Sequence, residues 1–258
     1  ITSAGALSLT GATGIDFGAG VIFTAGGDLT MSTTSGDISG TGAFTLTSTG
    51  DISLSENLTT AGATVITADS DASGAGDFSI DASTTLSTGN NSLALTANDV
   101  TVNGSISSGT GSTTIAVSDG GTIGLGGTSG NMTITGTELG NITAGTLNIG
   151  DSSTGNITVD GISAANSNNA TTVNLTTASA SSVSFSNNDS TFNALTANGG
   201  SSTSFGSGLT IATDTGKLDL DSTSITSAGA LTLTGATGID FRAGVAFTAG
   251  GDLTMSTT

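Results

Sequence analysis

The sequence contains no proline, cysteine, histidine, tryptophan or tyrosine, and it has very few basic residues. Without histidine and cysteine, neither the usual zinc sites nor Ser-His-Asp and Cys-His nucleophile systems can form. The two basic residues, Lys217 and Arg242, stand against 20 acidic ones, and the net charge is −18. Two cations cannot neutralise a phosphate backbone, so nucleic-acid binding is excluded. The same charge opposes binding to anionic lipid, and no run of about 18 apolar residues predicts insertion into a membrane as a helix.

Threonine, serine and glycine make up about half of the 258 residues, with 51, 38 and 41 copies. The 59 large aliphatic, phenylalanine and methionine residues are spread evenly and alternate with polar residues. Alternation over three to six residues predicts strands, and the Gly, Asn, Asp and Ser clusters between them predict turns. No window shows a convincing helical period, and we expect an all-β fold without helices.

The chain repeats itself, because residues 1–34 return as residues 225–258 with all but three positions identical. We therefore expect one long tandem repeat unit, residues 1–224, followed by the start of the next unit, residues 225–258, in a window of a longer array. Read with a period of two, the altered positions Gly18 and Ile22 lie on the same side of the extended chain, which we predict to face solvent. The three differences are Ser8 to Thr232, Gly18 to Arg242 and Ile22 to Ala246.

A shorter apolar-polar-apolar motif recurs inside the unit at a mean step of about 19 residues. A repeat of that length cannot close its own core and must stack on its neighbours. We predict a right-handed parallel β-helix (β-solenoid) with about twelve coils in each 224-residue repeat, which the absence of proline favours. The motifs of hexapeptide and calcium-binding nonapeptide solenoids are missing, and a β-sandwich does not explain the array. The first apolar residues of the motifs, which we expect to form an inward stack, are Leu7, Leu29, Phe44, Val65, Phe78, Leu93, Ile115, Met132, Leu147, Val173, Phe192, Leu209 and Leu231.

Five segments share a glycine, an Asp or Asn, and then an apolar residue, Ser or Thr, and a second apolar residue. They resemble the repeats of filamentous-haemagglutinin-type proteins, which are giant bacterial surface and secreted adhesins. The resemblance implies that the chain belongs to a long β-helical shaft outside a bacterial cell. The segments are Gly27–Met31, Gly76–Ile80, Gly130–Ile134, Gly155–Val159 and Gly251–Met255.

Two pairs of carboxylates, Asp69 with Asp71 and Asp219 with Asp221, are candidates for chemistry because we expect each pair on one side of an extended segment. Such pairs can serve a glycosidase or hold Ca²⁺. We interpret them as turn and solvent-face residues, since no ligand-dense loop or suitable base accompanies them. We therefore predict no enzyme activity, no catalytic, cofactor-binding or metal residues, and no cofactor, with weak Ca²⁺ binding as the alternative.

Nine Asn-x-Ser/Thr sequons are candidates for glycosylation, although a chain this rich in Ser and Thr produces many of them by chance. Rows of threonine on a flat face would suit ice binding, but that needs the same Thr-x-Thr position in successive coils, and the variable coil length argues against it. The sequons include Asn57, Asn131, Asn141, Asn156 and Asn174.

The sequence thus predicts a structural protein, the repetitive shaft of an extracellular or cell-surface bacterial fibre or adhesin that mediates surface attachment or filament formation. Its expected partners are other copies or continuing repeats of the same chain, and a host or surface receptor bound through a module outside these residues. The alternatives are a calcium-dependent surface-layer or ice-binding β-solenoid and, less favoured, a carbohydrate-active β-helix enzyme.

Overall fold

The computed structural model describes residues 1–258 and confirms the all-β class, with 51% strand and 3% helix. The protein is a β-solenoid of about 12 turns, built from parallel stacked coils. The chain forms two compact units. The N-terminal unit comprises Ile1–Asp119 with Asn141–Gly145, and the C-terminal unit comprises Gly120–Gly140 with Thr146–Thr258.

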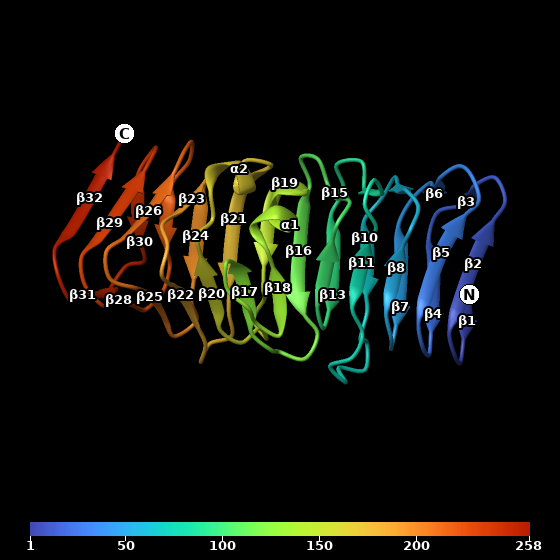
Figure 1. The fold of residues 1–258 in the computed structure, drawn as a ribbon, viewed down its shortest axis with the longest axis horizontal. Coiled ribbons are helices and arrows are strands. Elements are labelled where there is room, and N and C mark those ends of the chain that lie inside the picture. The colour runs from blue at the N-terminus through green and yellow to red at the C-terminus, as the bar shows by residue number, and fades with distance from the viewer. The chain divides into compact units, whose positions relative to one another are not determined.

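The N-terminal unit has three parallel sheets, here called faces A, B and C, because each coil contributes one strand to each face (Figure 1). Face A consists of β1 (Thr2–Ser3), β4 (Val21–Ala25), β7 (Phe44–Ser48), β10 (Thr64–Thr67), β13 (Leu93–Ala97) and β16 (Ser112–Val117). Face B consists of β2 (Leu7–Gly11), β5 (Leu29–Thr33), β8 (Ile52–Leu54), β11 (Phe78–Ile80) and β14 (Val100–Val102). Face C consists of β3 (Ile15–Phe17), β6 (Ile38–Gly40), β9 (Leu58–Thr60), β12 (Thr85–Ser87) and β15 (Ser105–Ser107), with the first residues of β19 (Ile142–Ile149) paired to β15.

The C-terminal unit is built in the same way, from faces D, E and F. Face D consists of β18 (Met132–Ile134), β17 (Ile123–Gly126), β20 (Ile157–Asp160), β22 (Ser182–Phe185), β25 (Ser202–Phe205), β28 (Ser224–Ser227) and β31 (Ala246–Ala249). Face E consists of β23 (Ser190–Phe192), β26 (Leu209–Thr213), β29 (Leu231–Gly235) and β32 (Leu253–Thr257). Face F consists of β21 (Ala170–Thr176), β24 (Leu195–Asn198), β27 (Leu218–Leu220) and β30 (Ile239–Phe241).

The core of each unit lies inside the coils, where alternate residues of every strand point. On face A, one inward position is apolar in five successive coils and fully buried in each. Some inward positions hold threonine or serine instead of a large apolar residue. Their buried hydroxyls form hydrogen bonds with each other, as Thr60 Oγ1 does with Thr64 Oγ1 at 2.6 Å. No buried side-chain polar atom lacks a hydrogen-bond partner, so the polar interior carries no desolvation penalty of that kind. The apolar column is Phe23, Leu46, Ile66, Leu95 and Ile115.

Coil length varies at the corners while the strands stay in register. Val21 pairs with Phe44 in the next coil, and Thr64 pairs with Leu93 in the next coil. The chain uses more residues to go from Thr64 to Leu93 than from Val21 to Phe44. The longer step arises because residues 68–77 form a loop between β10 and β11. Loops of this kind add length without shifting the ladder, since loop closure costs little more as a loop lengthens.

The two copies of the repeated sequence adopt the same strands. In the first copy Leu7 pairs with Leu29, and in the second Leu231 pairs with Leu253, which are the equivalent residues. The positions that differ between the two copies face solvent, as predicted. Ile22 is 57% exposed, and Arg242, which replaces Gly18 in the second copy, is also exposed. The repeat is therefore a repeat of structure as well as of sequence.

The prediction of one inward stack is wrong in two respects. The predicted residues are buried except for Leu7, which is half-buried, and Val65, which is 40% exposed. Around Val65 the inward side chains are instead its neighbours Thr64 and Ile66. The buried residues also belong to several faces, since Leu29 pairs with Ile52 rather than with the next predicted residue. The motif marks strands in general, and a step from one motif to the next is often shorter than a full coil.

The prediction of a helix-free chain is also wrong, because the C-terminal unit contains α1 (Gly136–Gly140) and α2 (Ala164–Ser167). The α1 turn begins with a capping box: Thr135 Oγ1 accepts a hydrogen bond from the Glu138 amide, and the Glu138 carboxylate accepts one from the Thr135 amide at 2.9 Å. This Thr-x-x-Glu pattern is readable in the sequence. Neither helix reaches the length and apolarity that crossing a membrane requires.

Candidate functional surface

The outer side of face A carries a column of threonines from β1 to β13, which ends at β16, where Ala116 pairs with Thr96. Register pairs five of them directly, one from each successive coil, at the spacing of neighbouring strands, about 4.8 Å. A second outward column beside it mixes threonine with exposed aliphatic residues such as Ile22 and Val65. The threonine column is Thr2, Thr24, Thr47, Thr67 and Thr96.

Hydroxyl columns recur on other faces of both units. On face B, Ser79 donates a hydrogen bond to Ser53 in the neighbouring coil at 3.1 Å. On face D, the Ser184 and Ser204 hydroxyls lie 2.9 Å apart. The strands of faces A and B contain no charged residue, although the chain carries a net charge of −18. The face B column is Ser8, Thr30, Ser53, Ser79 and Thr101, and the face D column is Thr158, Ser184, Ser204, Thr226 and Thr248.

The charge is concentrated at corners, most clearly between faces A and B. There, Asp28 Oδ1 accepts the backbone N–H of Asp51 at 3.1 Å, and Asp51 Oδ1 accepts that of Asp77 at 2.9 Å. Asp77 Oδ1 in turn accepts the N–H of Asp99 at 3.0 Å. Each carboxylate thus holds the start of the next coil, which compensates for the repulsion between stacked like charges.

This corner explains the glycine-aspartate motif of the sequence. A Cβ at Gly50 would collide with Asp28 Oδ1, and one at Gly76 would lie 2.6 Å from the Gly50 carbonyl oxygen. The residues before Asp51 and Asp77 therefore have to be glycine, because the neighbouring coil passes too close for a side chain, whereas Asn98 precedes Asp99. Sequence reasoning found the motif but missed this function, since the partners are about one coil apart.

The predicted pair Asp69 and Asp71 does not lie on an extended segment, which corrects that expectation. Asp69 is buried with a positive φ of 54° in the loop 68–77, and Asp71 is exposed. Asp69 accepts hydrogen bonds from the Ser73 hydroxyl at 2.9 Å and the Ser118 hydroxyl at 2.5 Å, as well as from backbone N–H groups. Burial raises the pKa of the Asp69 carboxyl, but these hydrogen bonds outweigh it and hold the pKa below its ordinary value.

The second pair, Asp219 and Asp221, lies beside the chain's single lysine. Lys217 Nζ pairs with Asp240 Oδ2 at 2.5 Å, and Asp219 is the register partner of Asp240 on face F. Burial, with the charges of Asp221 and Asp240, raises the pKa of Asp219. The ion pair is about half exposed and so contributes little to stability. No group of three or more acidic side chains lies together in a way that could hold a metal ion.

The named sequon asparagines join neighbouring coils or loops. Asn174 donates to Asn148 Oδ1 at 2.9 Å, and Asn141 donates to the Val102 carbonyl at 2.8 Å. Asn57 donates to Asp37 and accepts the Thr85 N–H, while Asn131 and Asn156 accept backbone N–H groups. These amides have a structural role that the sequence could not assign.

No protein-family model, curated protein or solved structure matches this chain. We therefore infer the function of this chain from its repeated coils and from the side chains on its surface.

Proposed function

We propose that this chain is the repetitive shaft of an extracellular bacterial fibre or adhesin of the filamentous-haemagglutinin type. The observation that carries the proposal is the return of the strands of the first copy, in the same register, in the second copy of the repeat. A sequence that recurs with its coil geometry can be extended by repetition alone, because each coil contacts only its neighbours. Such a shaft would hold an adhesive module away from the cell or build a matrix filament.

The surface chemistry supports this role. Faces covered with hydroxyls keep a stacked β-structure soluble, and corner carboxylates make like fibres repel one another. The partners in this proposal are other copies or continuing repeats of the chain, together with a receptor that a different module binds. The proposal includes no enzyme activity and no resident cofactor, and any binding of Ca²⁺ to the exposed carboxylates is weak.

Surface labelling of the cells that make the protein tests the proposal. An epitope inserted after Asp71, in the exposed part of loop 68–77, should bind antibody on intact cells, and electron microscopy should place the label on filaments outside the envelope. A cytoplasmic protein carrying the same epitope serves as the control and should be labelled only after lysis. Labelling of this chain only after lysis would rule out the extracellular shaft.

Ice binding is a second candidate, which the threonine column of face A favours. The variable coil length does not disturb that column, because loops absorb the additional residues. We expect Thr47→Lys combined with Thr67→Lys to abolish any ice-recrystallisation inhibition by the purified protein, since both changes put a charge into a regular neutral array. Thr59→Lys on face C is the matched control. If the wild-type protein has no such activity, this candidate is wrong.

A further inference from the structure

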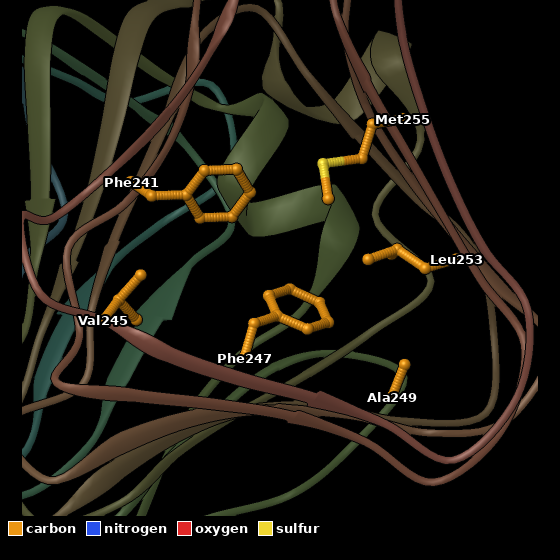
Figure 2. Close-up of a pocket in the computed structure, with 6 residues that line it drawn as sticks. All are labelled: Phe241, Val245, Phe247, Ala249, Leu253 and Met255. Atoms are coloured by element: carbon orange, nitrogen blue, oxygen red, sulfur yellow. The ribbon is translucent and has the colours of Figure 1, made fainter.

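Cavities on the inner and outer sides of the strands differ in their lining. The cavity that Figure 2 shows, of about 390 Å³, is lined only by apolar side chains of residues 241–255. These side chains belong to the interior of the solenoid, because their equivalents in the first copy of the repeat, among them Phe23, Leu29 and Met31, are fully buried. That cavity is therefore part of the core and not an outer binding site.

An outer groove of about 380 Å³ crosses three neighbouring coils of face F, at β21, β24 and β27. Register places Thr196 beside Asp219. Ala194 and Lys217 each lie two residues earlier in the chain and so on the same side. Hydroxyl groups, a carboxylate and the chain's single lysine therefore meet in one groove. Its lining includes Thr172, Ala194, Thr196, Thr215, Lys217 and Asp219.

Face F is also where the two basic residues of the chain lie, because Lys217 precedes β27 and Arg242 follows β30. Lys217 Nζ donates to Asp240 Oδ2 at 2.5 Å, and the lysine side chain is still 58% exposed. An ammonium group has three N–H donors, and Asp240 uses one of them. The groove thus offers a charged donor at Lys217 and a charged acceptor at Asp219.

The Asp219 carboxylate lacks the hydrogen bonds that hold other carboxylates of this protein. Asp69, Asp151 and Asp160 each accept several hydrogen bonds, which hold their pKa below the ordinary value. At Asp219, burial and two neighbouring carboxylates raise the pKa, and no hydrogen bond to the carboxylate opposes them. Donors from a bound molecule would supply the interactions that the fold does not provide here.

We propose that this groove binds a neutral oligosaccharide, whose hydroxyl groups donate to the Asp219 carboxylate and accept from the Lys217 ammonium and the threonine hydroxyls. The site binds its ligand and performs no chemical step. Threonine fits such a ligand because it combines a hydroxyl with a methyl group, as a sugar ring combines hydroxyl edges with C–H faces. Hydrogen bonds to the two ionised side chains are stronger than those between neutral groups.

Other classes of ligand fit the groove less well. The net charge of −18 repels acidic glycans, nucleic acids and anionic lipid headgroups. A peptide strand has no sheet edge to join, because β24 is already paired on both sides, with β21 and with β27. A metal ion lacks ligands, since no three acidic side chains lie together in a way that could hold one.

Titration of the ¹⁵N-labelled full chain with neutral tetrasaccharides, followed by NMR, tests the site. We expect at least one of cellotetraose, maltotetraose and mannotetraose to shift the amide signals of residues 194–196 and 215–219 in a saturable way. Tetragalacturonate, which has the same number of rings and a carboxylate on each, should give no saturable shift. Absence of saturable shifts with all the neutral probes, or shifts confined to other faces, would overturn the proposal.

Asp219→Asn should weaken binding of the neutral tetrasaccharide by about fivefold or more, because it replaces a charged acceptor by a neutral one. Asp71→Asn is the matched control, since it removes the same charge from an exposed position in the N-terminal unit. It should leave the affinity unchanged. Equal affinities of the two variants would contradict the role of Asp219.

Lys217→Met should also weaken binding by about fivefold or more, because it keeps an apolar stem and removes the ammonium donor. The ion pair that it breaks is exposed, so the fold should persist, which circular dichroism checks. Arg242→Met is the control, because it removes the same charge beside the same face but outside the lining of the groove. An equal loss in both variants would show that net charge controls binding, and it would overturn the proposal.

Glycan binding by the groove does not depend on the proposed role as an extracellular shaft. A shaft with this groove would contact a polysaccharide along its length as well as through a separate adhesive module. The titrations use purified protein, whereas the extracellular role is tested by labelling on cells. Either result can therefore fail while the other stands.

Discussion

Phe44→Ala is expected to lower the free energy of unfolding by about 3–5 kcal/mol, the usual cost of removing a fully buried phenylalanine. Phe44 is 0% exposed and packs against the rings of Phe17 and Phe23, which also contact each other. Truncation leaves a cavity at the centre of this cluster. The solenoid cannot easily collapse around it, because strand ladders fix the distance between coils. Urea denaturation followed by circular dichroism measures the change.

The loss should be local at first. Coils of a solenoid interact mainly with their neighbours, so hydrogen exchange should show β7 and its partners β4 and β10 losing protection before the rest of the chain. Val65→Ala is the control, because Val65 lies on the same face but points outward, and it should change stability by no more than about 0.5 kcal/mol. Similar effects of the two substitutions would show that the inward and outward sides of face A are misassigned.

Asp69→Ala is expected to destabilise the N-terminal unit by about 2–4 kcal/mol, because it removes a buried charged acceptor and leaves its donors unsatisfied. The donors include the Ser73 N–H at 2.8 Å and the Gly74 N–H at 3.1 Å in the same loop. Ser118 donates from beyond β16, at 2.5 Å. The carboxylate thus ties the loop 68–77 to a segment 49 residues away. Urea denaturation at pH 7 measures the change, and Asp71→Ala at an exposed position of the same loop should have little effect.

The effect of Asp69 should depend on pH. The folded state holds its pKa below the ordinary value, so the carboxylate stabilises the fold fully above that ordinary value, about 4. This stabilisation is lost as pH falls through the lowered pKa of the folded state. The difference in stability between wild type and Asp69→Asn should therefore shrink below about pH 4. A difference that stays constant down to about pH 2 would show that hydrogen bonds to the ionised form are not its source.

Much of the architecture could be predicted from alternation and repetition. Side chains of a strand alternate between two sides, so Phe23 and Ile22 had to face opposite ways, and the tolerated change of Ile22 to Ala246 indicated which side is solvent. A short repeat without a core of its own implied stacked coils. The capping box at Thr135 was equally local, and attention to the Thr-x-x-Glu pattern would have predicted α1.

The tertiary structure decided which strands pair and which polar residues are buried. The inward side of β10 consists of Thr64 and Ile66, and this register is set by pairing with Phe44 and Leu46 rather than by the local pattern, in which Val65 looks equally suitable. Asp69 is buried, and its carboxylate accepts a hydrogen bond from Ser118, which lies 49 residues away in the sequence. The threonine column forms because corner loops of different lengths bring each strand back to the same place. The physical reason is that alternation is a property of the strand itself, whereas register depends on how flexible Gly- and Ser-rich corners close, and that is determined only when neighbouring coils pack.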